Sequence, residues 1–72
     1  IMFYQINKSW IINLLKICDI GKQTDSRGIP IISVSWESGQ TDTYSFDSVE
    51  KRNQTFDDIK DILVGSRRSF IE

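Results

Sequence analysis

Polar and apolar residues alternate in the middle of the chain. From residue 32 to residue 37 every second side chain is apolar, and the same alternation returns from residue 43 to residue 46. A period of two is typical of a half-buried strand. Two strands joined by a hairpin are therefore predicted here. Pro30 fits the first position of the first strand, where a missing N–H group is tolerated.

The length of the hairpin loop decides which side chains share a face. A two-residue loop, Ser38-Gly39, would turn Tyr44 away from the other apolar residues. We predict a three-residue loop, residues 37–39, because Gly39 accepts the left-handed conformation that such a loop needs. The pairs that follow are Trp36 with Gln40, Val34 with Asp42 and Ile32 with Tyr44, and the resulting face holds Ile32, Val34, Trp36, Tyr44 and Phe46.

The segment from residue 10 to residue 20 fits two structures. As a helix capped by Ser9, it would be apolar around most of its circumference. As a strand, it is rich in β-branched residues and leads into turn signals at residues 21–28. We favour one long strand with two apolar faces. One face would hold Ile12, Leu14, Cys18 and Ile20, and the other Ile11, Leu15 and Ile17.

The C-terminal part predicts an amphipathic helix. Thr55 fits its N-cap and Gly65 fits the position just past its end, after a short turn at residues 49–52 that Asp47 or Ser48 could cap. Its apolar stripe is Phe56, Ile59, Ile62 and Leu63. With a further short strand at residues 3–6, the predicted fold is α+β and mainly β. It is a small antiparallel meander of about four strands, able to curl into a small barrel, with a C-terminal helix, in one domain over residues 1–72.

The side-chain inventory argues against catalysis. The chain has no histidine and a single cysteine, Cys18. Without histidine there is no ordinary general base near neutral pH, and one thiol cannot complete a zinc site. We predict that Cys18 is a buried, inert thiol. We therefore expect no enzyme activity, no catalytic residue, no metal and no cofactor.

The charge is nearly balanced, at −1 formally, which disfavours nucleic-acid binding. Nucleic-acid binding nevertheless stays the alternative function, since basic residues could converge in the fold while Trp10 stacks on a base. Those basic residues are Lys22, Arg27, Lys51, Arg52, Arg67 and Arg68.

Residues 34–44 resemble the hairpin of small SH3-like barrels. The run Val34-Ser35-Trp36-Glu37-Ser38-Gly39 followed by Tyr44 is similar to one in Tudor-type and Mib/Herc-type modules. The glycines that follow the tyrosine in Mib/Herc-type modules are replaced here by Ser45-Phe46-Asp47. The resemblance implies a protein-binding or peptide-binding role.

The predicted function is a non-catalytic protein-binding module, an inhibitor or adaptor. An apolar strand face that the helix leaves uncovered would form a twofold contact and make a homodimer. The candidate interface is Trp10, Ile11, Leu15 and Ile17. The absence of alanine and the abundance of isoleucine predict a low-GC bacterium, phage or mobile element as the source. No apolar run is long enough to span a membrane, and we expect a cytoplasmic protein.

Overall fold

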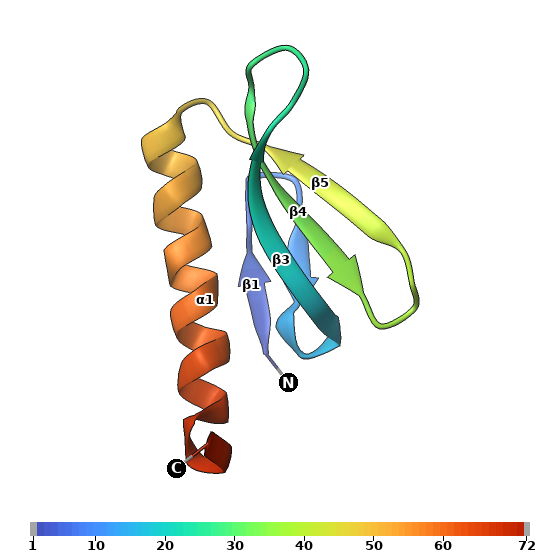
Figure 1. Ribbon diagram of the computed structural model, residues 1–72, viewed down its shortest axis with the longest axis vertical. Helices are drawn as coiled ribbons and strands as arrows, with labels where there is room; N and C mark the ends of the chain where they lie inside the picture. Colours follow the sequence, from blue (N-terminus) through green and yellow to red (C-terminus); the bar gives the residue numbers. More distant parts are fainter. Residues whose placement is uncertain (1, 72) are drawn as a thin grey trace.

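The chain folds into two antiparallel sheets and one helix. The computed structural model describes the backbone of residues 2–71 and the side chains of residues 2–65. Strands β1 (Phe3–Gln5) and β2 (Ile11–Asn13) pair in one hairpin, and strands β3 (Ile17–Thr24), β4 (Pro30–Trp36) and β5 (Thr41–Ser45) form the second sheet in chain order. The 3-10 turn η1 (Leu14–Lys16) joins the sheets, and helix α1 (Val49–Ile71) ends the fold (Figure 1). The predicted class, mainly β with a C-terminal helix, is confirmed. The described strands do not close into a barrel.

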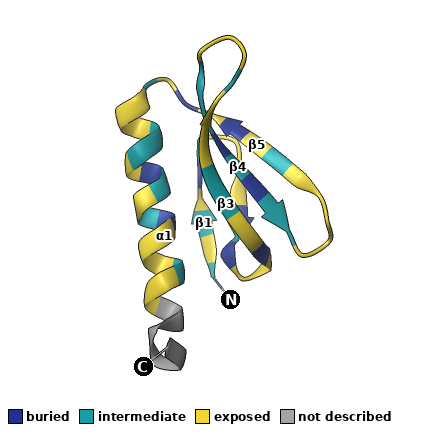
Figure 2. Cartoon of the chain, in the orientation of Figure 1, coloured by how far each residue is buried: buried dark blue, intermediate teal, exposed yellow. Residues whose placement is uncertain are grey.

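The core lies between the three-stranded sheet, the β1–β2 hairpin and α1. The helix contacts β3 and β4, and its side facing the strands is the more buried one (Figure 2). Ile32 and Val34, in the central strand β4, are completely buried, as is Ile59 of α1. The buried apolar residues are Ile6, Ile12, Leu14, Ile17, Ile32, Val34, Tyr44, Phe46 and Ile59. Among the described residues, no helix is both long and apolar enough to cross a membrane.

The β4–β5 hairpin has the predicted register. Ile32 pairs with Tyr44 and Val34 with Asp42, while the Trp36 N–H donates to the Gln40 carbonyl oxygen at 2.9 Å. Gly39 closes the loop with a φ of +93°, in the left-handed region where a side chain is unfavourable. Pro30 is the first residue of β4, as expected.

The prediction of one long strand over residues 10–20 is wrong. The extended chain is interrupted by η1, where the Asn13 side chain accepts a hydrogen bond from the Leu15 N–H at 3.1 Å. A bulge at the start of β3 shifts the pairing again between Ile17 and Asp19. These two irregularities change which side chains face inward, so that Ile17 is buried and Cys18 exposed. The strand also continues through Gly21 to Thr24, which shortens the predicted loop to residues 25–29.

The predicted ends of the helix are also wrong. The helix starts at Val49, because the Ser48 hydroxyl accepts a hydrogen bond from the Lys51 N–H at 3.1 Å and caps the first turn. The predicted short turn at residues 49–52 is thus the first turn of α1. Thr55 lies inside the helix and is buried. Gly65 does not end it, since its φ is not positive and the helix continues to Ile71.

Candidate interaction surfaces

The outer face of the β1–β2 hairpin, together with the turn η1 that follows it, carries three large exposed apolar side chains. Phe3 pairs with Asn13 and Gln5 with Ile11, so Phe3 and Ile11 lie on the same face of the hairpin. Leu15 follows two residues after Asn13, in η1. The exposed fractions of the three are 63%, 64% and 52%. We call Phe3, Ile11 and Leu15 the hairpin patch.

The four residues predicted as an interface do not form one surface. Ile11 and Leu15 are exposed, as the prediction requires. Ile17 is in the core, because η1 and the β3 bulge turn it inward, and it cannot contact a partner. Trp10 is exposed but lines a small cavity with residues of β5. Phe3 was missed because a residue near the end of a three-residue strand gives too short a pattern to assign a face.

A cleft of about 540 Å³ lies where β1, the β1–β2 loop, the end of β5 and α1 meet. The Asp58 carboxylate accepts hydrogen bonds there from the Gln54 amide at 3.0 Å and from the Tyr4 hydroxyl at 3.5 Å. Burial, and then the charge of Asp58, raises the pKa of Tyr4 above its usual value. Lys51 also lines the cleft. The Tyr4–Asp58 hydrogen bond therefore links β1 to α1, and the Asp58 carboxylate already accepts from two donors.

A second cavity, of about 270 Å³, separates Trp10 from β5. The Asp42 carboxylate lines it, and it accepts from the Trp36 indole N–H at 2.8 Å and from the Gln40 side-chain amide at 3.1 Å. Tyr44 forms part of the wall, and burial together with the Asp42 charge raises its pKa. An aromatic face and a fixed carboxylate thus border one opening.

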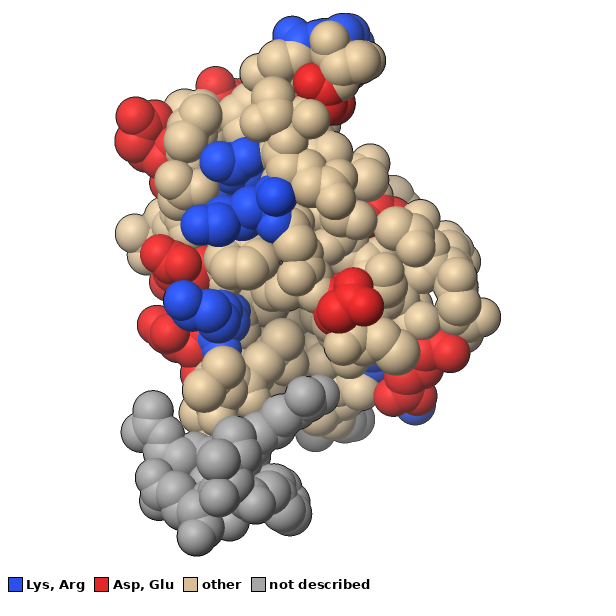
Figure 3. Space-filling model, in the orientation of Figure 1, with Lys and Arg blue, Asp and Glu red and all other residues tan. Residues whose placement is uncertain are grey.

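The basic residues of the predicted nucleic-acid site converge only in part. Arg52 donates to the Gln23 carbonyl oxygen at 2.6 Å, and the Lys22 Nζ lies 5.1 Å from the centroid of the Phe56 ring. Both therefore sit between α1 and β3, where Figure 3 shows a group of basic side chains with acidic ones beside it. Lys51 lines the cleft instead. The side chains of Arg67 and Arg68 lie outside the described residues.

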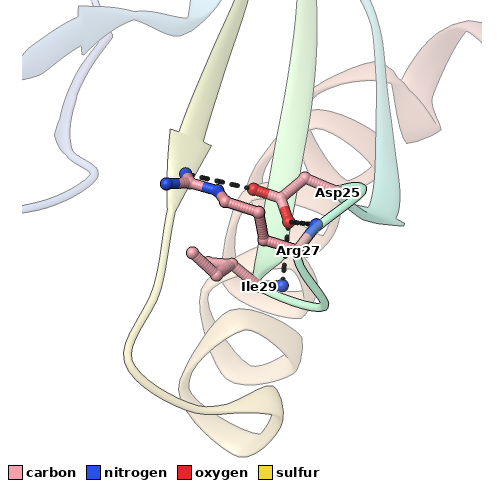
Figure 4. Close-up of polar contacts among 3 residues, drawn as sticks. All are labelled: Asp25, Arg27 and Ile29. Atoms are coloured by element: carbon pink, nitrogen blue, oxygen red, sulfur yellow. Dashed lines mark hydrogen bonds and ion pairs between the residues drawn. The ribbon is translucent and has the colours of Figure 1, made fainter.

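The Arg27 side chain pairs with Asp25 of the same loop. The Asp25 carboxylate accepts from the N–H groups of Arg27 at 2.8 Å and Ile29 at 2.9 Å, and the Arg27 guanidinium lies 3.5 Å from it (Figure 4). The bonds from Ile29 and Arg27 hold the pKa of Asp25 below its usual value. The loop at residues 25–29 is thus shaped around one carboxylate rather than around a phosphate group.

The prediction of a buried thiol is wrong, since Cys18 is exposed at the β3 bulge. Among the described residues, no three acidic or cysteine side chains come close enough together to hold a metal ion. The described side chains form three candidate surfaces: the hairpin patch, the cleft and the cavity beside Trp10.

Comparison of the chain with protein-family models, with curated proteins and with solved structures finds no match. The resemblance of residues 34–44 to SH3-like modules therefore stays a prediction.

Proposed function

We propose that this chain is a non-catalytic protein-binding module that contacts its partner through the hairpin patch. One observation carries the proposal: Phe3 and Ile11 on the β1–β2 hairpin, and Leu15 in the turn η1 that follows it, are each more than half exposed. Isolated exposed apolar residues are common on proteins, but neighbouring ones are typical of contact sites. The open face of the other sheet differs, since it carries hydroxyl residues such as Ser33, Thr41 and Thr43.

The first partner we propose is a second copy of the chain. A twofold contact would place the hairpin patch of one copy against that of the other and remove both from water. With a thin core, the chain gains from burying this surface in a dimer. In an inhibitor or adaptor role, the same patch would cover a surface of another protein.

The test is the mass of the chain in solution, measured by analytical ultracentrifugation from low to high micromolar concentration. Leu15→Glu should give a folded monomer, because it places a charge in the contact. Val64→Glu is the matched control, since Val64 has a similar exposure, 48%, but lies on α1. It should leave the mass unchanged. A wild-type chain that is monomeric at high micromolar concentration would contradict the homodimer.

For a partner other than a second copy, the readout is differential capture. A host protein that is retained by the wild-type chain and by Val64→Glu, but lost with Leu15→Glu, supports binding of that protein through the hairpin patch. Retention by all three chains places the contact elsewhere and counts against the hairpin patch.

Nucleic-acid binding is the second candidate, favoured by the neighbouring side chains of Lys22 and Arg52. Its test is the anisotropy of labelled single-stranded and double-stranded DNA and RNA. Binding should weaken steeply as salt is added and fall further in Lys22→Ala. No binding at low salt would exclude this function.

A further inference from the structure

Among the described residues, one edge of strand β5 pairs with no other strand. Its hydrogen-bonded pairs with β4 include Trp36 with Gln40, and the Phe46 N–H donates to the Pro30 carbonyl oxygen at 2.9 Å. Hydrogen-bonded and non-bonded pairs alternate along an antiparallel ladder. The backbone N–H and C=O groups that point away from β4 are therefore those of Thr41, Thr43 and Ser45. No backbone hydrogen bond to these outward groups occurs among the described residues, and β5 borders open space on the side away from α1 (Figure 1).

The opposite edge of the same sheet is protected. Strand β3 has a bulge after Ile17, and the Arg52 guanidinium reaches its backbone at Gln23. The Lys22 ammonium packs over α1 at Phe56. Bulges, charged side chains and covering helices are the usual devices that stop a strand from pairing with another chain. Among the described residues, β5 has no bulge and no covering helix. Its outward backbone groups belong to threonine and serine, and the carboxylate of its one charged residue, Asp42, accepts hydrogen bonds from Trp36 and Gln40.

The cavity between Trp10 and β5 lies beside this open edge. Its volume of about 270 Å³ is below the range of about 300–1,000 Å³ typical of small-molecule pockets. It is therefore suited to one side chain rather than a whole ligand. Trp10 is 59% exposed, and the Asp42 carboxylate is held in place by hydrogen bonds from Trp36 and Gln40.

We propose that an extended peptide segment of another protein adds to the β5 edge and inserts a lysine or arginine side chain between Trp10 and Asp42. The backbone of the peptide would bond to the outward groups of β5, which is how added strands gain affinity. Alternate side chains of an added strand point to opposite faces. A residue opposite Asp42 would face the cavity, where the carboxylate and the indole both attract a cation.

This peptide site is separate from the hairpin patch, and it goes beyond the function proposed above. Peptide binding is therefore measured on Leu15→Glu as well as on the wild-type chain. Loss of the dimer without loss of peptide binding, or the reverse, shows which of the two proposals fails.

The probe is a synthetic seven-residue peptide, acetylated and amidated, that alternates threonine with valine and has arginine at its centre. Binding is followed by two-dimensional NMR of the isotope-labelled chain. Resonances of Thr41, Thr43 and Ser45 should shift. Exchange of the Thr43 N–H with solvent should slow at least tenfold on saturation, because this outward donor gains an acceptor. Exchange that stays unchanged under saturating peptide would overturn the proposal.

Two control peptides separate the backbone from the side chain. A peptide with central glutamate should bind at least tenfold more weakly than the arginine peptide. The arginine peptide with N-methyl groups on alternate residues should not bind, because it cannot donate to the edge. Equal binding of the arginine and glutamate peptides would overturn the assignment of the cavity.

Variants of the chain test the same two contacts. Thr43→Pro removes an outward N–H that β4 does not use, so the fold should persist and binding should be lost. Trp10→Ala should weaken binding of the arginine peptide about threefold to tenfold, and Trp10→Phe should weaken it less. Val64→Glu should leave affinity unchanged. If the free chain is a dimer whose Thr43 N–H is already protected, a second copy occupies the edge and the peptide proposal is wrong.

Discussion

Arg52 joins the first turns of the helix to the backbone of a strand 29 positions earlier in the chain. Its guanidinium donates to the carbonyl oxygen of Gln23 at 2.6 Å. Helix α1 contacts the three-stranded sheet mainly at β3 and β4. The Arg52–Gln23 hydrogen bond therefore helps to fix the position of the helix on the sheet.

Replacing Arg52 should lower the stability of the fold measurably. The hydrogen bond from the charged Arg52 donor to the exposed Gln23 carbonyl is worth about 1 kcal/mol, so we expect Arg52→Ala to lose about that much free energy of unfolding. Urea denaturation measures the difference. Arg27→Ala is the control, because the Arg27 side chain is 76% exposed and its ion pair with Asp25 is screened by solvent and should contribute little. Equal losses in both variants would refute the role given to Arg52.

A side chain at Gly39 should destabilise the β4–β5 hairpin. Gly39 has a φ of +93°, and a Cβ placed there would meet nothing within 4 Å. The cost of Gly39→Ala is therefore conformational, and we expect about 1–2 kcal/mol. Thermal unfolding followed by circular dichroism tests this. An unchanged midpoint would mean that the loop adopts another turn.

The opposite result is expected at Gly65. This glycine lies inside α1 with open space around it, so Gly65→Ala should stabilise the chain by up to about 1 kcal/mol. The same thermal scan applies. A loss of stability would indicate that the helix ends near Gly65, as the sequence pattern predicted.

Acid should weaken the loop at residues 25–29. The pKa of Asp25 is lowered in the folded chain by hydrogen bonds from Ile29 and Arg27. A lowered folded pKa stabilises the fold above the ordinary carboxyl range, and this contribution is lost as pH falls through about 4 and below. Stability should therefore decline on acidification less steeply in Asp25→Asn than in the wild-type chain. Parallel slopes between pH 5 and pH 2 would contradict this.

The thiol of Cys18 should react in the folded protein. It is exposed at the β3 bulge, so a thiol reagent such as Ellman's should modify one group per chain without denaturant. The rate should be within about tenfold of the rate in the unfolded chain. Protection by several orders of magnitude would mean that the bulge places Cys18 inward.

Sequence patterns predicted the parts of this fold that depend on neighbouring residues. The β4–β5 register followed from alternation and from Gly39, because the loop and both strands lie within about fifteen residues. The helix was predicted, but its start was not. Threonine often begins a helix, whereas Thr55 here lies buried inside α1. Turn η1 was missed because its apolar residues continue the pattern of the strands on either side.

The candidate surfaces depend on contacts between distant segments, so the sequence predicted fewer of their features. Ile11 and Leu15 were assigned to a surface correctly, but Ile17 was not, because one turn and one bulge reverse its direction. The cavity that Trp10 forms with Asp42 requires the β1–β2 loop to lie against β5, and no local pattern contains that packing.

Turn η1 makes the fold sensitive to the number of residues between the two sheets. It sets which of two consecutive side chains, Ile17 or Cys18, enters the core. Deleting one residue from Leu14–Lys16 would exchange them and reverse every later side chain of β3. An insertion in the loop at residues 25–29 would lengthen the connection between β3 and β4 but leave the pairing of the two strands in register. Natural variation in chain length should therefore be found in that loop, while the spacing between β2 and β3 stays constant.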